Sequence, residues 1–260
     1  MSRSRTRSSK KKTVTIAVLV ACLLLAAIGG TIAWMTVKDS LTNQFTVGNF
    51  NDPEKDPEGE DKLDPDGEDK DKLDGHLYEP SWDAENNKIT PGGTLKKDPY
   101  VGIGADSEDA YVYVYVRNSA TDPDDIYFAL NTGWEVVDAD LAQEATALND
   151  EYDPKPNDAS PSTKYYVSGL FRYNKKLEAN PDKDSWTETP VFDEVFVRHS
   201  ADNTTLSPVS GSNITALKVT ALLHQATSGN NTPNLETVAD TWATTEAAKL
   251  AKEDLNTTTE

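Results

Sequence analysis

The sequence predicts an all-β fold, an antiparallel sandwich or barrel, over residues 76–260. The clearest strand is Ala110–Arg117, in which tyrosine and valine alternate strictly. Such alternation is typical of a strand whose two faces meet different surroundings. Several other short apolar runs are separated by stretches rich in glycine, proline, serine and aspartate. Many short strands joined by turns indicate a sandwich or a barrel.

Six more segments have strand patterns, and two have helical spacing. The predicted strands are Leu95–Val101, Ile126–Leu130, Trp134–Val137, Tyr165–Tyr173, Val191–Arg198 and Ile214–Leu223. A short helix is predicted over Asp138–Asn149, and a longer one over Leu235–Leu255, with an apolar face made by Leu235, Val238 and Trp242.

The Tyr/Val strand allows two interpretations. Val112, Val114 and Val116 lie on one face and are expected to pack inward. The opposite row, Tyr111, Tyr113 and Tyr115, either covers an outer face of the sheet or is buried against a partner.

The N-terminus has the organisation of a secretory signal peptide. Residues 1–12 hold six basic residues and no acid, and the apolar run Thr13–Ile28 follows. Small residues then precede a predicted cleavage between Ala33 and Trp34. An uncleaved membrane anchor is the alternative, and acylation of Cys22 in a lipobox-like context is another. In each case the chain after this segment is expected outside the cell.

Two segments lie between the signal peptide, residues 1–33, and the body. Residues 34–50 are nearly uncharged and form a predicted N-terminal tag strand. Residues 51–75 hold 12 acids and four lysines, so we expect an acidic, disordered insert that lengthens the tether to the body. Weak calcium binding at Asp64, Asp66 and Glu68 is the alternative to a plain spacer.

Composition and motifs argue against several classes of function. The formal net charge of −19 disfavours nucleic-acid binding, and a single cysteine excludes a disulfide framework or a cysteine-rich zinc site. No metalloprotease, nucleotide-binding or serine-hydrolase motif is present. His76, His199 and His224 are isolated and are expected at the surface. We therefore expect no enzyme activity, metal or cofactor, and membrane contact only through the signal segment before cleavage.

Several motifs resemble one family of exported proteins. The stretch Gly29–Phe50 (GGTIAWMTVKDSLTNQFTVGNF) is similar to signal peptides that a dedicated SipW-type signal peptidase of Gram-positive bacteria processes. Downstream motifs agree with this resemblance: Glu79–Asp83, Ile89–Gly93, Lys97–Pro99, Ser107–Val112, Pro190–Val195 and Ala221–Ala226 followed by Trp242. The chain thus resembles the TasA/camelysin (CalY) family.

The resemblance implies a secreted protein with a jelly-roll-like β-sandwich that builds extracellular fibres of a biofilm matrix. It also implies assembly in which the mature N-terminal strand is donated to a neighbouring subunit. Donation of a strand satisfies the unpaired backbone groups of a sheet edge. The residues expected to carry it are Leu41, Phe45, Val47 and Phe50. The alternative is a monomeric cell-surface binding module, with residues 34–50 folded into its own sheet. The casein-cleaving activity associated with camelysin is not expected here, because no zincin helix is present.

Overall fold

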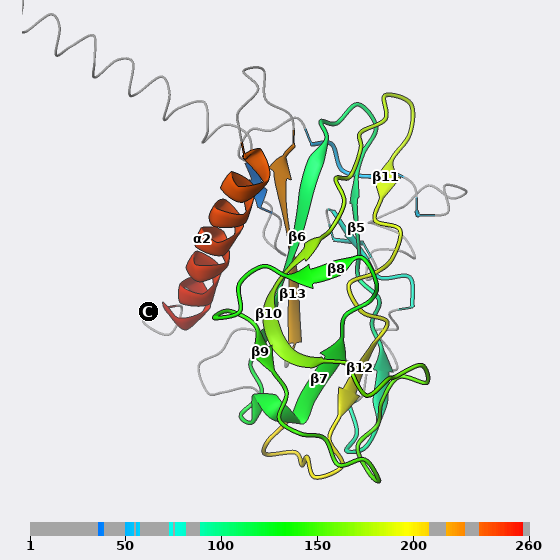
Figure 1. Cartoon of the computed structure of the whole chain (residues 1–260), viewed down its shortest axis with the longest axis vertical. Coiled ribbons are helices and arrows are strands. Elements are labelled where there is room, and N and C mark those ends of the chain that lie inside the picture. The colour runs from blue at the N-terminus through cyan, green and yellow to red at the C-terminus, as the bar shows by residue number, and fades with distance from the viewer. Residues whose placement is uncertain are drawn as a thin grey trace, which may run out of the picture.

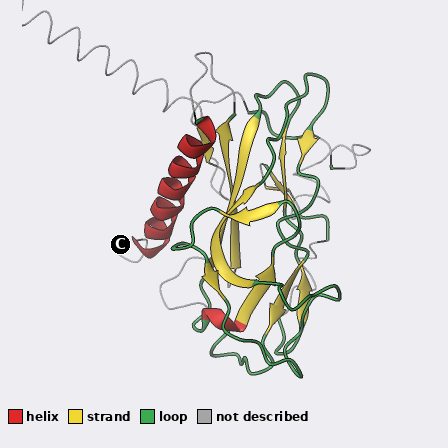
Figure 2. Ribbon diagram, in the orientation of Figure 1, coloured by secondary structure: helices red, strands yellow, loops and turns green. Residues whose placement is uncertain are grey.

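The computed structural model describes residues 36–38, 50–54, 56–57, 73–74, 76–81, 89–207, 217–226 and 234–256. Within them the chain forms two antiparallel sheets, one α-helix and one short 3-10 helix, η1 (Pro123–Asp125) (Figures 1 and 2). The predicted all-β fold is confirmed.

The larger sheet has nine strands. Seven follow one path in the order β1 (Thr36–Lys38), β13 (Leu217–Gln225), β6 (Ala110–Asn118), β10 (Tyr165–Tyr173), β7 (Ile126–Ala129), β12 (Glu194–Val197) and β4 (Thr94–Lys96). The short strands β8 (Trp134–Val136) and β9 (Gln143–Glu144) both pair with β10.

Strand β10 gives this sheet its curl, which Figure 1 shows. Tyr165 and Tyr166 pair with β7, whereas Gly169–Arg172 pair with β6. Gly169 stands at this change of partner with φ +156, and a β-carbon there would lie 2.8 Å from the Phe171 ring. A side chain would clash at this point, so glycine permits the bend.

The smaller sheet has the order β11 (Ser185–Trp186), β5 (Tyr100–Ile103), β3 (Leu77–Tyr78) and β2 (Leu73–Asp74). One segment predicted as a single strand is shared between this sheet and the larger one. The segment Leu95–Val101 was expected to be continuous, but Pro99 divides it, and β4 and β5 join different sheets. Proline lacks the N–H that a sheet interior needs, which explains the break.

The main core lies where the two sheets face each other. Val112, Val114 and Val116 are fully buried in it, as predicted for that face of the strand. Ile103 of the smaller sheet and Phe128 of the larger one belong to the same cluster. Each such side chain contributes about 1.5–3 kcal/mol on burial, which makes this cluster the main stabilising element.

Helix α2 (Leu235–Asn256) covers the outer face of β6, β10 and β13 (Figure 1). The helix agrees with its prediction, but the buried face differs. Ala239, Ala243 and Ala247, one turn apart, are fully buried, and Leu250 extends the row. Small side chains let the helix approach the sheet closely, whereas Trp242 is only half-buried at the margin.

The predicted helix over Asp138–Asn149 is wrong. The Asp138 side chain accepts a hydrogen bond from the N–H of Asp140 and forms a turn. Strand β9 follows and pairs with β10, and the Ala145 N–H donates to the Tyr165 carbonyl. Pairing with β10 therefore overrides a weak local helical preference.

The chain docks on the body before the acidic stretch. Phe50 is 5% exposed in the main core, and the Asn51 side chain donates to the Ala105 carbonyl at 2.7 Å. The Glu54 N–H donates to the Asp184 carboxylate, and β2 orders residues 73–74. The described residues at both ends of the range 51–75 therefore belong to the fold. Residues 58–72 lie outside the described residues, and so does the calcium-binding alternative at Asp64, Asp66 and Glu68.

Within the described part of the chain, no helix is both long and apolar enough to cross a membrane. Residues 1–35, which hold the predicted signal segment and Cys22, lie outside it.

Candidate assembly site

The N-terminal strand β1 adds to the edge of the larger sheet. It pairs antiparallel with β13, with Thr36 opposite His224, Val37 opposite Leu223 and Lys38 opposite Leu222. On its other side β13 pairs with β6 over all nine of its residues, Leu217–Gln225. The tag segment therefore has the backbone pattern needed to extend this sheet.

The acceptor strand β13 is well fixed on both of its faces. Ala221 and Leu223 are buried in the main core, and Leu222 is buried beneath α2. His224 is 5% exposed, and its ring lies 5.4 Å from the Trp242 ring. Burial lowers the pKa of His224 below its ordinary value. The expectation of a surface histidine at this position is wrong.

Most of the residues predicted for export and assembly lie outside the described residues: Ala33, Trp34, Leu41, Phe45 and Val47. Phe50 is described, and it is part of this chain's own core. A strand given to a neighbour would therefore have to end before Phe50, unless this side chain left the core.

The tyrosine row lies beneath α2. Tyr113 is fully buried, Tyr115 is 9% exposed, and Tyr111 packs partly buried against the same cluster. The Tyr113 hydroxyl donates to Asp240 on the helix at 2.8 Å, and burial together with this bond raises its pKa. A partner could reach these tyrosines only after the helix had moved, so the face is not an open interface.

A cluster around Arg172 holds α2 in place. Its guanidinium lies 3.0 Å from the Asp240 carboxylate and 2.5 Å from that of Glu236, both on the helix. It also pairs with Glu135 of β8. The acidic residues of α2 are thus matched by an arginine of the sheet.

Arg198 forms a second cluster that the sequence did not indicate. It is 8% exposed, and it donates to the Asp124 carbonyl at 2.8 Å and to the Thr146 carbonyl at 2.9 Å. Its guanidinium also pairs with the carboxylates of Asp124 at 2.8 Å and Asp153 at 3.2 Å. Arg198 thereby fixes the segment 146–153 on the larger sheet. The only sequence signal is a charged residue that ends an apolar strand.

The three histidines have different surroundings in the structure. No group of three or more histidine, cysteine or acidic side chains in that part of the chain could hold a metal ion. His76 is fully buried, with Nδ1 2.9 Å from the Gly102 carbonyl and Nε2 3.5 Å from Asp52. Burial lowers its pKa, although Asp52 opposes this effect. His199 alone is exposed as expected, with its ring 5.5 Å from that of Tyr152.

Comparisons with family models, with characterised proteins and with solved structures gave no match. The family resemblance therefore depends on the sequence motifs alone.

Proposed function

We propose that this chain is a secreted structural subunit of extracellular fibres or of a biofilm matrix, assembling by donation of its N-terminal strand to a neighbour. The pairing of β1 with β13 is the observation that carries this proposal. It supports the idea that the segment before Phe50 fits the edge of β13.

The same pairing can be made between two copies of the chain. If β1 of one subunit occupies the β13 edge of the next, the hydrogen bonds are the same and only the connectivity differs. Such an exchange of an identical element is a low-cost route to assembly. When each subunit gives to one neighbour and receives from another, and the rotation between subunits does not close a ring, a filament results.

Export belongs to the same proposal. A signal segment processed between Ala33 and Trp34 by a SipW-type signal peptidase would free the N-terminal strand outside the cell. The strand could pair with a neighbour only after this release.

A second function is favoured by the placement of β1 and Phe50 in their own chain. A monomeric cell-surface binding module, similar to an adhesin, would hold its N-terminal segment in this way. The two functions differ in whether the β1–β13 pairing forms within one chain or between two chains.

Paired cysteines can distinguish them. The mature chain, residues 34–260, contains no cysteine, so Val37→Cys/Leu223→Cys introduces a single pair of cysteines, which can join within one chain or between two. Directly opposed residues have Cα atoms about 4.5–5.5 Å apart, which suits a disulfide. In the control, Val37→Cys/Val219→Cys, the second site is four residues along β13, about 13 Å away.

The oxidised protein is examined by electron microscopy, by sedimentation and on a non-reducing gel. Strand donation predicts filaments whose subunits are linked by disulfides between chains. On the gel these give a ladder of dimers, trimers and larger species, which should be much weaker in the control. A version starting at Phe50 should remain a folded monomer. Filaments joined only by intrachain disulfides would refute donation of this strand. Failure of the mature chain to assemble at high concentration and high salt would favour the binding module.

A further inference from the structure

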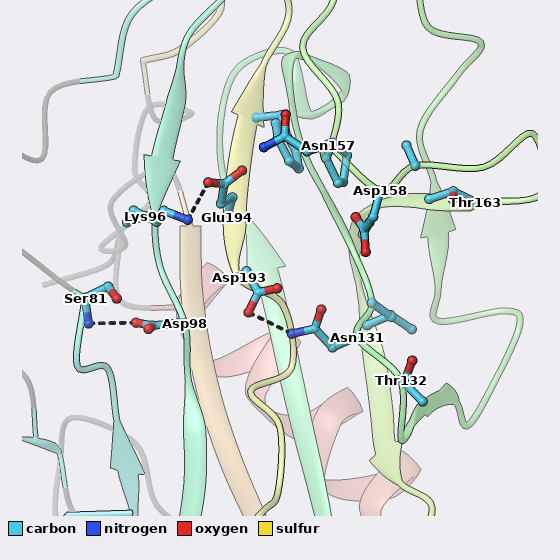
Figure 3. A pocket seen from close by; sticks show the side chains of 15 residues that line it. Ser81, Lys96, Asp98, Asn131, Thr132, Asn157, Asp158, Thr163, Asp193 and Glu194 are labelled. Atoms are coloured by element: carbon cyan, nitrogen blue, oxygen red, sulfur yellow. Dashed lines mark hydrogen bonds and ion pairs between the residues drawn. The ribbon is translucent and has the colours of Figure 1, made fainter.

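A polar cavity lies at the end of the larger sheet opposite β1. Its volume is about 570 Å³, within the range of about 300–1,000 Å³ typical of small-molecule sites. One wall is made by β4, β12 and the turn after β7, and the other by the loop between β9 and β10 (Figure 3). The cavity is open to solvent, since Asn157, Asp158 and Asp193 are exposed.

The lining offers hydrogen-bond donors and acceptors on both walls. Amides come from Asn131 and Asn157, and hydroxyls come from Ser81, Thr132 and Thr163. In Figure 3, Asp158 and Thr163 lie on the opposite side of the view from Lys96 and Ser81. Ala129, Leu130, Pro156 and Ala159 add apolar patches. Polar groups mixed with small apolar patches suit a ligand that has many hydroxyls on a carbon ring.

Part of the lining is held in position. The Asp98 carboxylate accepts from the Ser81 N–H at 2.9 Å and interacts electrostatically with Lys96. The Asn131 side chain donates to Asp193 at 3.0 Å and to the Pro190 carbonyl at 3.2 Å. Prepositioned polar groups of this kind lose less entropy when a ligand binds.

The negative charge of the cavity lining favours a ligand that carries a positive charge. Asp98, Asp158, Asp193 and Glu194 supply four carboxylates, and Lys96 is the one basic side chain in the lining. The Lys96 ammonium lies 2.6 Å from Glu194 and also interacts electrostatically with Asp98 and Asp193. Four carboxylates and one ammonium group leave the lining with a formal charge of −3. Such a site repels phosphate and acidic sugars and attracts a cationic group.

We propose that this cavity binds an amino sugar, a ring with several hydroxyls and a free ammonium group, presented as a short oligosaccharide or as the end of a polysaccharide. The ammonium group lies among Asp98, Asp158 and Asp193, and the hydroxyls bond to the amides of Asn131 and Asn157. This site is independent of the fibre proposal, since none of these residues lies on β1 or β13.

The experiment is titration of the mature protein with a β-1,4-linked glucosamine trimer by isothermal calorimetry. Asp158→Asn is the informative variant, because Asp158 is exposed and makes no hydrogen bond or ion pair among the described residues, so the fold should tolerate the change. Asp182→Asn is the matched control, since Asp182 is an exposed aspartate that does not line the cavity. The N-acetylated trimer serves as the ligand without a positive charge.

The expected result is saturable binding of the glucosamine trimer that weakens up to about fivefold in Asp158→Asn, as for one exposed ion pair, and stays unchanged in Asp182→Asn. The N-acetylated trimer should bind more weakly than the charged one. Equal weakening in both variants would show general attraction to an acidic protein and would overturn the proposal. The absence of binding at millimolar trimer, or tighter binding of the N-acetylated trimer, would also overturn it.

Discussion

Replacing Arg198 by methionine should destabilise the protein strongly. Methionine keeps most of the side-chain length but removes the donors to Asp124, Thr146 and Asp153. The Asp153 side chain is only 5% exposed, so its charge would lose its arginine partner inside the protein. Breaking a buried ion pair in this way costs about 3–5 kcal/mol.

The lower end of this range is expected here. Asp153 keeps two other hydrogen bonds, from the N–H groups of Asn149 at 2.8 Å and His199 at 3.0 Å. Burial alone would raise the pKa of Asp153, but these two bonds and Arg198 together lower it. A loss of about 3 kcal/mol is a large part of a typical stability of about 5–15 kcal/mol. The variant should therefore fold but unfold at a clearly lower urea concentration.

Urea unfolding followed by tryptophan fluorescence measures this loss. A decrease of about 3 kcal/mol should lower the midpoint by about 1 M or more. Lys183→Met is the control, since Lys183 is an exposed basic residue with no ion pair among the described residues, and it should change stability by less than about 0.5 kcal/mol. If Arg198→Met lost less than about 1 kcal/mol, Arg198 would not be the residue that fixes segment 146–153.

Two further predictions concern α2 and the buried histidines. Ala243→Leu should cost about 1–3 kcal/mol, because Ala243 is fully buried on the face of α2 that packs against the sheet, and a larger side chain would overpack this contact. Thermal unfolding checks this against Thr245→Leu on the exposed face of α2, and equal effects would contradict the close packing. His76 and His224 have pKa values lowered by burial, so the unfolded chain binds more protons and stability should fall as the pH drops below about 6.5. The slope is at most about 1.4 kcal/mol per pH unit for each histidine; urea unfolding between pH 7.5 and 5.5 checks it, and a flat profile would exclude the effect.

The Tyr/Val strand was predictable because each of its faces is covered by a different part of the molecule. The valines pack in the main core and the tyrosines beneath α2, and the strand is long enough for its strict alternation to be recognised. The division at Pro99 was also present in the sequence, since proline in a strand pattern argues against continuity. The helix predicted over Asp138–Asn149 failed because its partner, β10, is distant in sequence, and local spacing carries no information about that pairing.

The residues of the buried helix face and of the cavity lining were harder to predict. The buried face of α2 is made mainly of alanines. The prediction instead chose the face with the large apolar residues Leu235, Val238 and Trp242, because large apolar side chains are the usual sign of a buried face. The cavity draws residues from five separate segments between Ser81 and Phe196, and only the fold brings them together. Phe50 was predicted as a residue of the donated strand, whereas it lies in the core of its own chain. Its burial depends on contacts made by the docked segment that follows it.

The docking of Phe50–Glu54 ahead of the acidic stretch has a consequence for engineering. The chain is attached to the body at Glu54 and again at strand β2, so the stretch between these points is tied at both of its ends. Doubling the length of such a loop costs only about 0.6 kcal/mol in chain entropy. A foreign peptide placed there would be displayed without altering the point where the N-terminal strand leaves the body. If the chain builds fibres, this loop is the place to decorate every subunit along them.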